Sequence, residues 1–199
     1  MAAMALFNLE HSKAVYAADF ALYGAAVVAL AAFLFLAGPR SLRLEIACFT
    51  VAGLAGWTAI EYFLHRFVLH GMRPFRGWHA EHHQRPTAFV STPTIFSASM
   101  VVILVFLPAW ALAGPWPAGA ITLGVLIGYL AYAITHHATH HWRADSAWMK
   151  QRKLWHALHH RAATQPGYYG VTSGFWDRVF GSAAAQPRLR AVDEALNEA

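Results

Sequence analysis

The chain has 199 residues, of which 57% are hydrophobic and 13% are charged, and its formal net charge is +5. Soluble domains carry about 25% charged residues, so this composition excludes an ordinary soluble protein and indicates a membrane protein. The single cysteine, Cys48, excludes an internal disulfide and a thiolate metal site. The sequence has no basic helix or aromatic reading surface, which argues against nucleic acid and favours lipid headgroups as partners of the basic residues.

Four apolar segments follow one another along the chain, each close to the ~20 residues that cross a hydrocarbon core. They cover about 19–36, 45–64, 95–113 and 118–134. The first ends in Gly38-Pro39-Arg40 rather than in a small-residue cleavage site, so we interpret it as a retained anchor and not as a signal peptide. Only residues 114–117 join the last two segments, which predicts a tight antiparallel hairpin.

The predicted fold is therefore all-α, an integral membrane four-helix bundle with a cytosolic histidine-rich helical cap. We divide the chain into an N-terminal segment (1–17), a membrane domain with its metal-binding cap (18–183) and a flexible tail (184–199). Basic residues concentrate in 66–85 and after the fourth segment, which places the cap and the N-terminus in the cytoplasm by the positive-inside rule. Arg40 and Arg43 argue weakly against this orientation. We expect a multi-pass protein of a bacterial inner membrane.

Histidine is the residue whose distribution is unusual, because twelve of the 13 fall in four tight groups. The groups are His65 and His70; His79, His82 and His83; His136, His137, His140 and His141; and His156, His159 and His160. Residues three or four apart share one face of a helix, so the last three groups can each present rings on one side. Residues five apart do not share a face of a regular α-helix, and we expect a bend near Gly71 to bring the first pair together.

Neutral imidazole binds iron, zinc and copper well, and one metal ion takes about four to six ligands. About eight to ten histidines therefore suit two metals, whereas a structural zinc ion needs only about four ligands. Without metal, so many rings beside a membrane would repel one another when protonated and lose hydration when buried. The sequence therefore predicts a dimetal centre just under one membrane surface.

Acidic residues near the histidines are few. Glu61 lies one helical turn before His65 and could accept a hydrogen bond from its imidazole, or it could reach towards headgroups instead. Glu81 is expected to face outward. Four adjacent imidazoles in the third group cannot all face one site, so one or two of them are expected to lie beside it or to be exposed.

These boxes, in this order, resemble those of the fatty acid hydroxylase superfamily, also called the sterol desaturase family. The resemblance rests on Glu61-Tyr-Phe-Leu-His65-Arg-Phe-Val-Leu-His70, Trp78-His79-Ala-Glu-His82-His83, Thr135-His136 through His141, and Leu154-Trp-His156-Ala-Leu-His159-His160. It continues into Tyr169-Gly-Val-Thr-Ser-Gly-Phe-Trp-Asp-Arg-Val-Phe-Gly181, which is similar to the segment closing the catalytic core of fatty acid 2-hydroxylases. The resemblance covers about 44–181.

The resemblance implies a four-helix membrane bundle, a dimetal site, dioxygen as co-substrate and an external electron donor. The family pattern in the third box, H-x3-H after Thr, selects His136 and His140. It leaves His137 and His141, with Glu61 and Asp177, as candidates for support around the ligands. The predicted ligands are His65, His70, His79, His82, His83, His136, His140, His156, His159 and His160. The cofactors would be two iron ions, with zinc possible in the purified protein, and no catalytic residue is expected beyond the ligands.

We predict a membrane-bound, dioxygen-dependent oxidoreductase of the monooxygenase type that hydroxylates a lipid, with a fatty acyl chain as the preferred substrate. No fused cytochrome b5 domain is evident, so a separate ferredoxin or cytochrome b5-like donor is expected. His70 and His79 are only nine residues apart, which resembles the short carotenoid hydroxylases. A carotenoid hydroxylase or a desaturase on the same metal core is therefore the alternative. A non-enzymatic metal-binding membrane protein is disfavoured, because a carrier needs ligands at mid-membrane.

Overall fold

The computed structural model describes residues 10–90, 92–161 and 167–184. Within these ranges the chain is helical, with one isolated bridge between Glu10 and Val90 and no strand, which confirms the all-α prediction. Four helical stretches are long and apolar enough to cross a membrane, as in a multi-pass membrane protein. They are Lys13–Ala37, Arg40–Leu69, Thr94–Ala113 and Pro115–His141. The predicted tail lies almost wholly outside the described residues.

The first two spans are α1 (Lys13–Ala37) and α2 (Arg43–Phe63), joined through the 3-10 turn η1 (Arg40–Leu42). Ser12 caps α1, since its side chain accepts a hydrogen bond from the backbone N–H of Val15. At its far end α2 passes without interruption into η2 (Leu64–Leu69), a π-helix. The second span therefore reaches beyond its apolar segment and carries the first histidines out of it.

The third span consists of α4 (Thr94–Val101), the π-helix η3 (Val102–Phe106) and α5 (Leu107–Ala113). Gly114 alone separates α5 from α6 (Pro115–His141), and its φ of 83° is a left-handed conformation that side chains other than glycine rarely adopt. The predicted hairpin is thus confirmed. Helix α6 continues past the expected end of its apolar segment and carries the third histidine group on its last two turns.

Helix α6 occupies the centre of the bundle and packs against α2 backbone to backbone. A methyl group on Gly124 would lie 2.1 Å from the carbonyl oxygen of Thr50, and one on Gly53 would lie 2.2 Å from that of Ile121. Only glycine permits this approach, and small residues at such contacts are typical of helices packed in membranes. The third span, by contrast, has no buried residue in its most apolar stretch.

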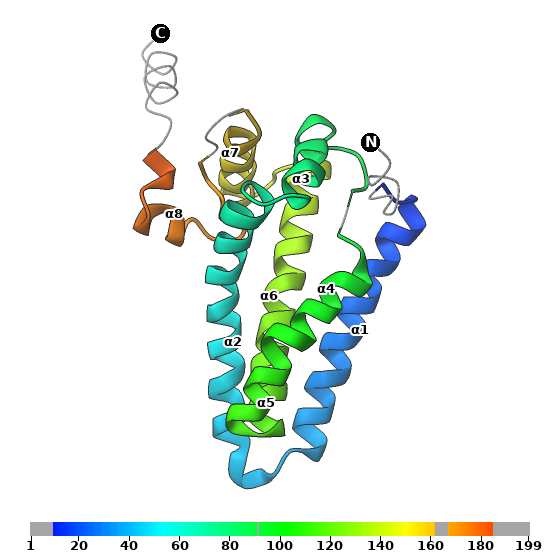
Figure 1. Ribbon diagram of the computed structural model, residues 1–199, viewed down its shortest axis with the longest axis vertical. Helices are drawn as coiled ribbons and strands as arrows, with labels where there is room; N and C mark the ends of the chain where they lie inside the picture. Colours follow the sequence, from blue (N-terminus) through cyan, green and yellow to red (C-terminus); the bar gives the residue numbers. More distant parts are fainter. Residues whose placement is uncertain (1–9, 91, 162–166, 185–199) are drawn as a thin grey trace.

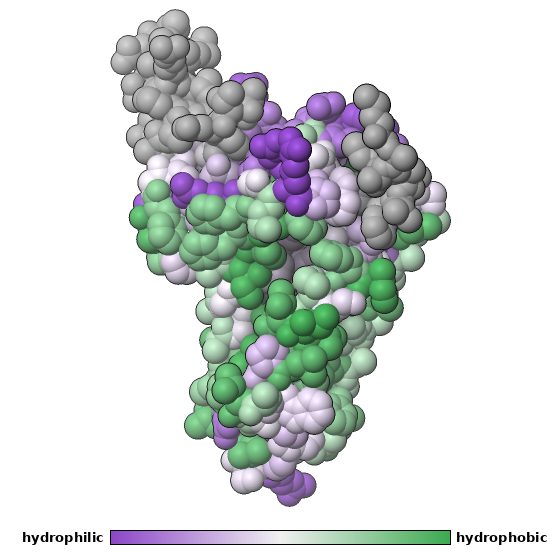
Figure 2. Space-filling model, in the orientation of Figure 1, coloured by the Kyte–Doolittle hydropathy of each residue, from purple (hydrophilic) through white to green (hydrophobic). Residues whose placement is uncertain are grey.

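The remaining helices form a cap at one end of the bundle (Figure 1). They are α3 (Phe75–Gln84), α7 (Ala147–Arg161) and α8 (Phe175–Val179), followed by the 3-10 turn η4 (Ser182–Ala184). Figure 2 shows a mainly hydrophobic surface over the bundle and hydrophilic residues gathered at the cap. Most of the buried polar side chains lie where the cap meets α2 and α6, among them Glu61, His65, His159 and Asp177.

Candidate metal centre

The pair His65 and His70 is brought together by a π-turn, not by the bend expected near Gly71. In η2 the backbone N–H of His70 donates to the carbonyl oxygen of His65 over 3.2 Å, the i to i+5 bond of a π-helix. The wider turn places residues five apart over one another, and the two ring centroids lie 5.2 Å apart. The expectation of a bend was wrong because it considered only the regular α-helical period.

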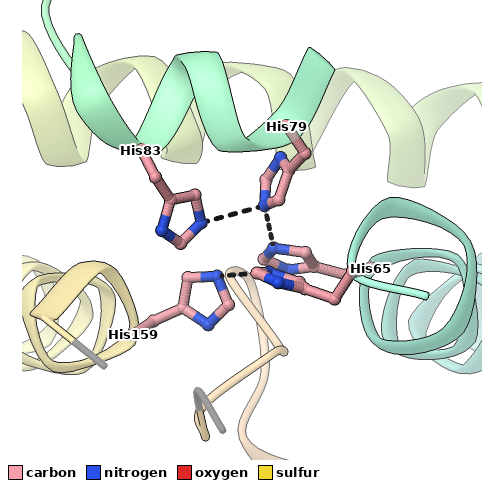
Figure 3. A group of neighbouring side chains, drawn as sticks. His65, His79, His83 and His159 are labelled. Atoms are coloured by element: carbon pink, nitrogen blue, oxygen red, sulfur yellow. Dashed lines mark hydrogen bonds between the residues drawn. The ribbon is translucent and has the colours of Figure 1, made fainter. Parts of the chain in front are cut away.

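Five histidines, from η2 and the residue that follows it, from α3 and from α7, form a first group, in which the ligand nitrogens all lie within 4.8 Å of one another. They are His65, His70, His79, His83 and His159. The Nε2 atom of His79 lies 3.0 Å from Nε2 of His65 and 3.0 Å from Nε2 of His83. The Nε2 atoms of His70 and His159 are also 3.0 Å apart. Figure 3 shows four of these rings pointing towards one another from η2, α3 and α7.

A second group of five has the same internal spacing and comes from α3, α6 and α7. It consists of His82, His136, His140, His156 and His160. The Nε2 atoms of His82 and His136 are 3.0 Å apart, and Nε2 of His156 lies 2.8 Å from Nε2 of His140 and 3.0 Å from that of His160. The ten histidines expected as ligands are therefore divided equally between two groups.

Helices α3 and α7 each serve both groups, because i, i+3 and i+4 positions fan out around a helix. On α3 the pair His79 and His83 enters the first group while His82 enters the second. On α7 a single histidine, His159, enters the first group, while the pair His156 and His160 enters the second. The ring of His83 stacks on that of His160 with 4.1 Å between centroids, so the two groups adjoin.

Two backbone carbonyls fix the protons on the first group. Nδ1–H of His65 donates to the carbonyl oxygen of Tyr169 over 2.6 Å, and Nδ1–H of His159 donates to that of Gly167 over 2.8 Å. A carbonyl can only accept, so the proton of each neutral ring resides on Nδ1. The Nε2 lone pairs are then bare and point into the group. Each of these two lone pairs faces a neighbouring ring at 3.0 Å, His79 in one case and His70 in the other. Each can therefore bind a cation or accept a proton from that ring.

Burial keeps the rings uncharged. It lowers the pKa of His70 and His83 to about 4, with the positive charge of His83 adding to the effect on His70. Burial, followed by the charges of neighbouring histidines, lowers the pKa of His82 and His160 to about 3. At neutral pH these imidazoles are therefore free to act as ligands. Two nitrogens bound at ~2.1 Å to one ion, at right angles, lie ~3.0 Å apart, which matches the observed spacing.

The other two histidines of the third box lie outside both groups. The ring of His137 stacks on that of His141 with 4.4 Å between centroids and packs against Tyr16 on α1. His141 in turn stacks on Phe89. These rings tie α6 to α1 and to the loop after α3, whereas His136 and His140 face the second group.

Residues 50–182 match the family model described as fatty acid hydroxylase. This chain belongs to the fatty acid hydroxylase family. The residues matched by the family model include all ten histidines of the two groups, together with Glu61 and Asp177.

Several relatives of this family member are known. A dihydroceramide fatty acyl 2-hydroxylase of Arabidopsis thaliana is 35% identical over 152 residues, covering 69% of this chain and 61% of the plant protein. A ceramide very long chain fatty acid hydroxylase of Saccharomyces cerevisiae is 35% identical over 166 residues, covering 72% of this chain and 40% of the yeast protein. The chain thus spans less than two thirds of the length of either relative.

A solved structure supports the fold of this hydroxylase-family chain. It is described as full-length scs7p with only the hydroxylase domain visible, and it matches with a TM-score of 0.73 and 26% sequence identity. The match covers 87% of this chain and 67% of that chain.

Two of the three acidic residues named from the sequence, Glu61 and Asp177, bind backbone N–H groups of the segment that follows α7. We call this segment, which includes Asp177, the closing segment (residues 167–182). Glu61 does not bond His65, so that one of the two roles considered for it was wrong. Its Oε1 accepts from the backbone N–H of Val171 at 2.6 Å and of Thr172 at 2.9 Å, and its Oε2 accepts from the Thr172 hydroxyl. Asp177 is fully buried and accepts from the N–H groups of Tyr169 and Gly170.

Sequence reasoning missed three contributors to the site. The carbonyls of Gly167 and Tyr169 carry no side-chain signal, so nothing in the sequence indicates that histidines bind them. The buried Arg152 donates to the carbonyl oxygen of Thr172 over 3.2 Å, and its guanidinium lies 4.1 Å from the centroid of the Trp155 ring. Its place on α7, four residues before His156, is the one signal that could have identified it. Glu81 faces outward as expected.

Proposed function

We propose that this chain is a membrane-bound lipid hydroxylase, an oxidoreductase of the monooxygenase type, with two iron ions held by the ten histidines of the two groups. Dioxygen is the co-substrate, and the acyl chain of a fatty acid or ceramide-like lipid is the substrate. The observation that carries this proposal is the pair of five-imidazole groups whose Nε2 atoms converge at spacings of 2.8–3.0 Å. The names of the relatives, all acyl-chain hydroxylases, support the reaction type.

The chemical tasks divide between the metals and the protein. A pair of redox-active iron ions supplies the power to activate dioxygen and to remove hydrogen from an unactivated C–H bond. The histidines hold the ions in neutral form, because burial keeps their rings deprotonated. The carbonyls of Tyr169 and Gly167 orient two of these rings. The burial of His65, His79, His156 and His159 keeps bulk water from the reacting centre.

The substrate would approach from the bilayer along a groove of about 310 Å³ between α2, η3 and α6. The lining includes Gly53, Gly56 and Ile60 of α2, Leu104 and Val105 of η3, and Val125 of α6. Ile60, the lining residue of α2 nearest the cap along the chain, is five residues before His65, so this end of the groove is the one nearer the histidine groups. A carbon near the headgroup would then reach the metals while the tail extends into the membrane, in agreement with the 2-hydroxylase names of the relatives.

Orientation and electron supply belong to the same proposal. We place the cap in the cytoplasm of a bacterial inner membrane because the cap side carries most of the basic residues, including Arg73, Arg76 and Arg85. A separate reduced ferredoxin or cytochrome b5-like protein would deliver electrons there. A carotenoid substrate is not favoured, since the relatives are named for fatty acyl or ceramide hydroxylation.

The deciding experiment expresses the chain in cells that lack endogenous 2-hydroxy lipids and supplies ¹⁸O₂. Total lipids are then hydrolysed and analysed by mass spectrometry. We expect 2-hydroxy acids that carry one ¹⁸O atom and that are missing from cells expressing His156→Ala. A new double bond without incorporated oxygen would identify a desaturase, and unchanged lipids with metal-replete protein would contradict an enzymatic role on acyl chains.

A further inference from the structure

We propose that the two histidine groups hold their metal ions with unequal affinity, the first group more tightly, and that Asp177 is the positioning residue responsible. This inference rests on the proposed metal centre and extends it. It concerns the atoms behind the ligands, not the ligands themselves. Metal-binding histidines usually donate their second ring N–H to an acceptor, which fixes the ring and raises its basicity, and loss of such an acceptor typically weakens binding about 10- to 100-fold.

The groups differ in these acceptors. In the first group His65 and His159 each donate Nδ1–H to a backbone carbonyl, at 2.6 and 2.8 Å. In the second group Nδ1 of His82 and Nδ1 of His156 are buried and have no hydrogen-bond partner among the described residues. Both carbonyls that serve the first group belong to the closing segment, and no ring of the second group bonds the described part of that segment.

Asp177 binds the closing segment at Tyr169, the residue whose carbonyl oxygen accepts from His65. Its Oδ1 accepts from the N–H of Tyr169 at 2.8 Å, and its Oδ2 accepts from the N–H of Gly170 at 2.8 Å. The Ser182 hydroxyl donates to Oδ1 as well, at 2.7 Å. Tyr169 therefore binds Asp177 through its N–H and His65 through its carbonyl. The buried carboxylate thus orients a ligand of the first group through one peptide unit.

The hydrogen-bond pattern predicts opposite responses to amide substitution at the two carboxylates. Both oxygens of Asp177 accept from backbone N–H groups, so the NH₂ of an asparagine would face a donor in either orientation. At Glu61 both backbone N–H groups bond Oε1, while Oε2 accepts from the Thr172 hydroxyl. A hydroxyl can turn and accept from an amide. Asp177→Asn should therefore disturb the closing segment, and Glu61→Gln should preserve it.

The test measures bound Zn²⁺ per chain on the full-length, detergent-purified protein dialysed against buffers of decreasing free Zn²⁺. Zinc is chosen because it has no redox chemistry. We expect the wild type to lose its two ions in two separate steps. His156→Ala should lack the weaker step and His159→Ala the tighter one, which assigns the steps to the groups. His137→Ala, a histidine of α6 outside both groups, is the matched control and should retain both steps.

Asp177→Asn should weaken the tighter step about 10- to 100-fold and leave the weaker one in place. Glu61→Gln should leave both steps within about threefold of wild type, and Glu61→Leu should weaken the tighter step. Ser182→Ala, which removes one bond to Asp177 and keeps both backbone bonds, should weaken the tighter step alone by less than about tenfold. This milder variant decides the matter if Asp177→Asn does not fold, as judged by helical circular dichroism.

Other results overturn the inference in distinguishable ways. A single step in the wild type, with two ions per chain, rejects unequal affinity and leaves the proposed metal centre intact. Equal weakening of both steps by Asp177→Asn and Ser182→Ala reduces Asp177 to a general structural role. If His156→Ala loses the tighter step instead of the weaker one, the second group binds its ion more tightly and the proposal is rejected. Failure of the wild type to bind any Zn²⁺ rejects the metal centre as well.

Discussion

Nδ1–H of His65 donates to the carbonyl oxygen of Tyr169, 104 residues further along the chain, over 2.6 Å. This bond ties the end of the second span to the closing segment after α7. The ring of His65 therefore cannot turn about its own axis without breaking a bond to a segment that Glu61 and Asp177 hold in place. Such a contact forms only when the two ends of the family region have come together, so the first histidine group depends on the complete fold.

Removing one ring from the second group should abolish activity without unfolding the bundle. We expect His82→Ala to retain about one metal ion per chain and to lower hydroxylated lipid by more than about 100-fold, because a ligand has a larger effect than the residues behind it. Metal analysis and lipid mass spectrometry measure both quantities. His141→Ala, which removes a ring stacked on Phe89 outside the groups, is the control. Equal product from His82→Ala and wild type would remove His82 from the site.

The contact between α2 and α6 should not tolerate a methyl group at Gly124. The added carbon would lie 2.1 Å from the Thr50 carbonyl oxygen, and both helices would have to separate. Overpacking of this kind costs about 1–3 kcal/mol or more, so Gly124→Ala should unfold at a lower temperature than wild type. Gly24→Ala in α1 is the matched control, since its methyl group would meet nothing within 4 Å. Equal thermal midpoints for the two variants would show that the helices can separate without loss of stability.

A larger side chain at Gly56 should block the proposed acyl groove while sparing the metals. Its added Cβ would meet nothing within 4 Å, so Gly56→Leu is expected to fold and to fill the groove lined by Ile60 and Leu104. We expect turnover of long acyl chains to fall about tenfold with metal content unchanged, and short chains to be affected less. Competition between two chain lengths in one lipid mixture measures the ratio, with Gly24→Leu on α1 as control. An unchanged ratio would mean that the chain enters elsewhere.

Acid should destabilise the metal-free protein in a defined range. Burial lowers the pKa of His70 and His83 to about 4 and, with neighbouring charges, that of His82 and His160 to about 3, from the ordinary value of 6.5. Between pH 6.5 and these lowered pKa values, the unfolded chain binds protons that the folded chain does not. The histidines therefore contribute their whole stabilisation above pH 6.5, and it is lost as the pH falls towards 4 and 3.

Thermal unfolding of chelator-treated protein from pH 8 to pH 4 measures this slope, and the metal-loaded protein should release its ions over the same range because protons compete for the rings. A midpoint that stays constant down to pH 5 would show that the buried histidines do not control stability. A midpoint that rises on acidification would show that the rings are charged in the folded state.

The sequence was sufficient to predict features that depend on a repeated spacing or on the length of a segment. Apolar segments of membrane-crossing length predicted the four spans, and i, i+3 and i+4 spacing predicted which rings share a face of α3 or α7. The selection of His136 and His140 over His137 and His141 came from the family pattern, and the structure brings the same two into the second group.

What could not be predicted depends on irregular backbone or on backbone atoms. The π-turn that aligns His65 with His70 has no side-chain signature, and a regular helical wheel separates the two residues. The partner of Glu61 was missed because it is the backbone N–H of Val171, which lies 110 residues further along the chain. The division of the ten rings into two groups requires the relative placement of α3, α6 and α7, which no local pattern contains.

The glycine contact between α2 and α6 has a consequence for the protein in lipid bilayers of different thickness. One of these helices leads into His65 and the other carries His136. Main-chain atoms already in close contact at Gly53 and Gly124 therefore limit how far these two histidines can move relative to each other. A thinner or thicker bilayer can tilt this pair of helices together, but sliding one past the other would drive carbonyl oxygens into α-carbons. The distance between the groups should therefore stay constant across membranes of differing lipid composition.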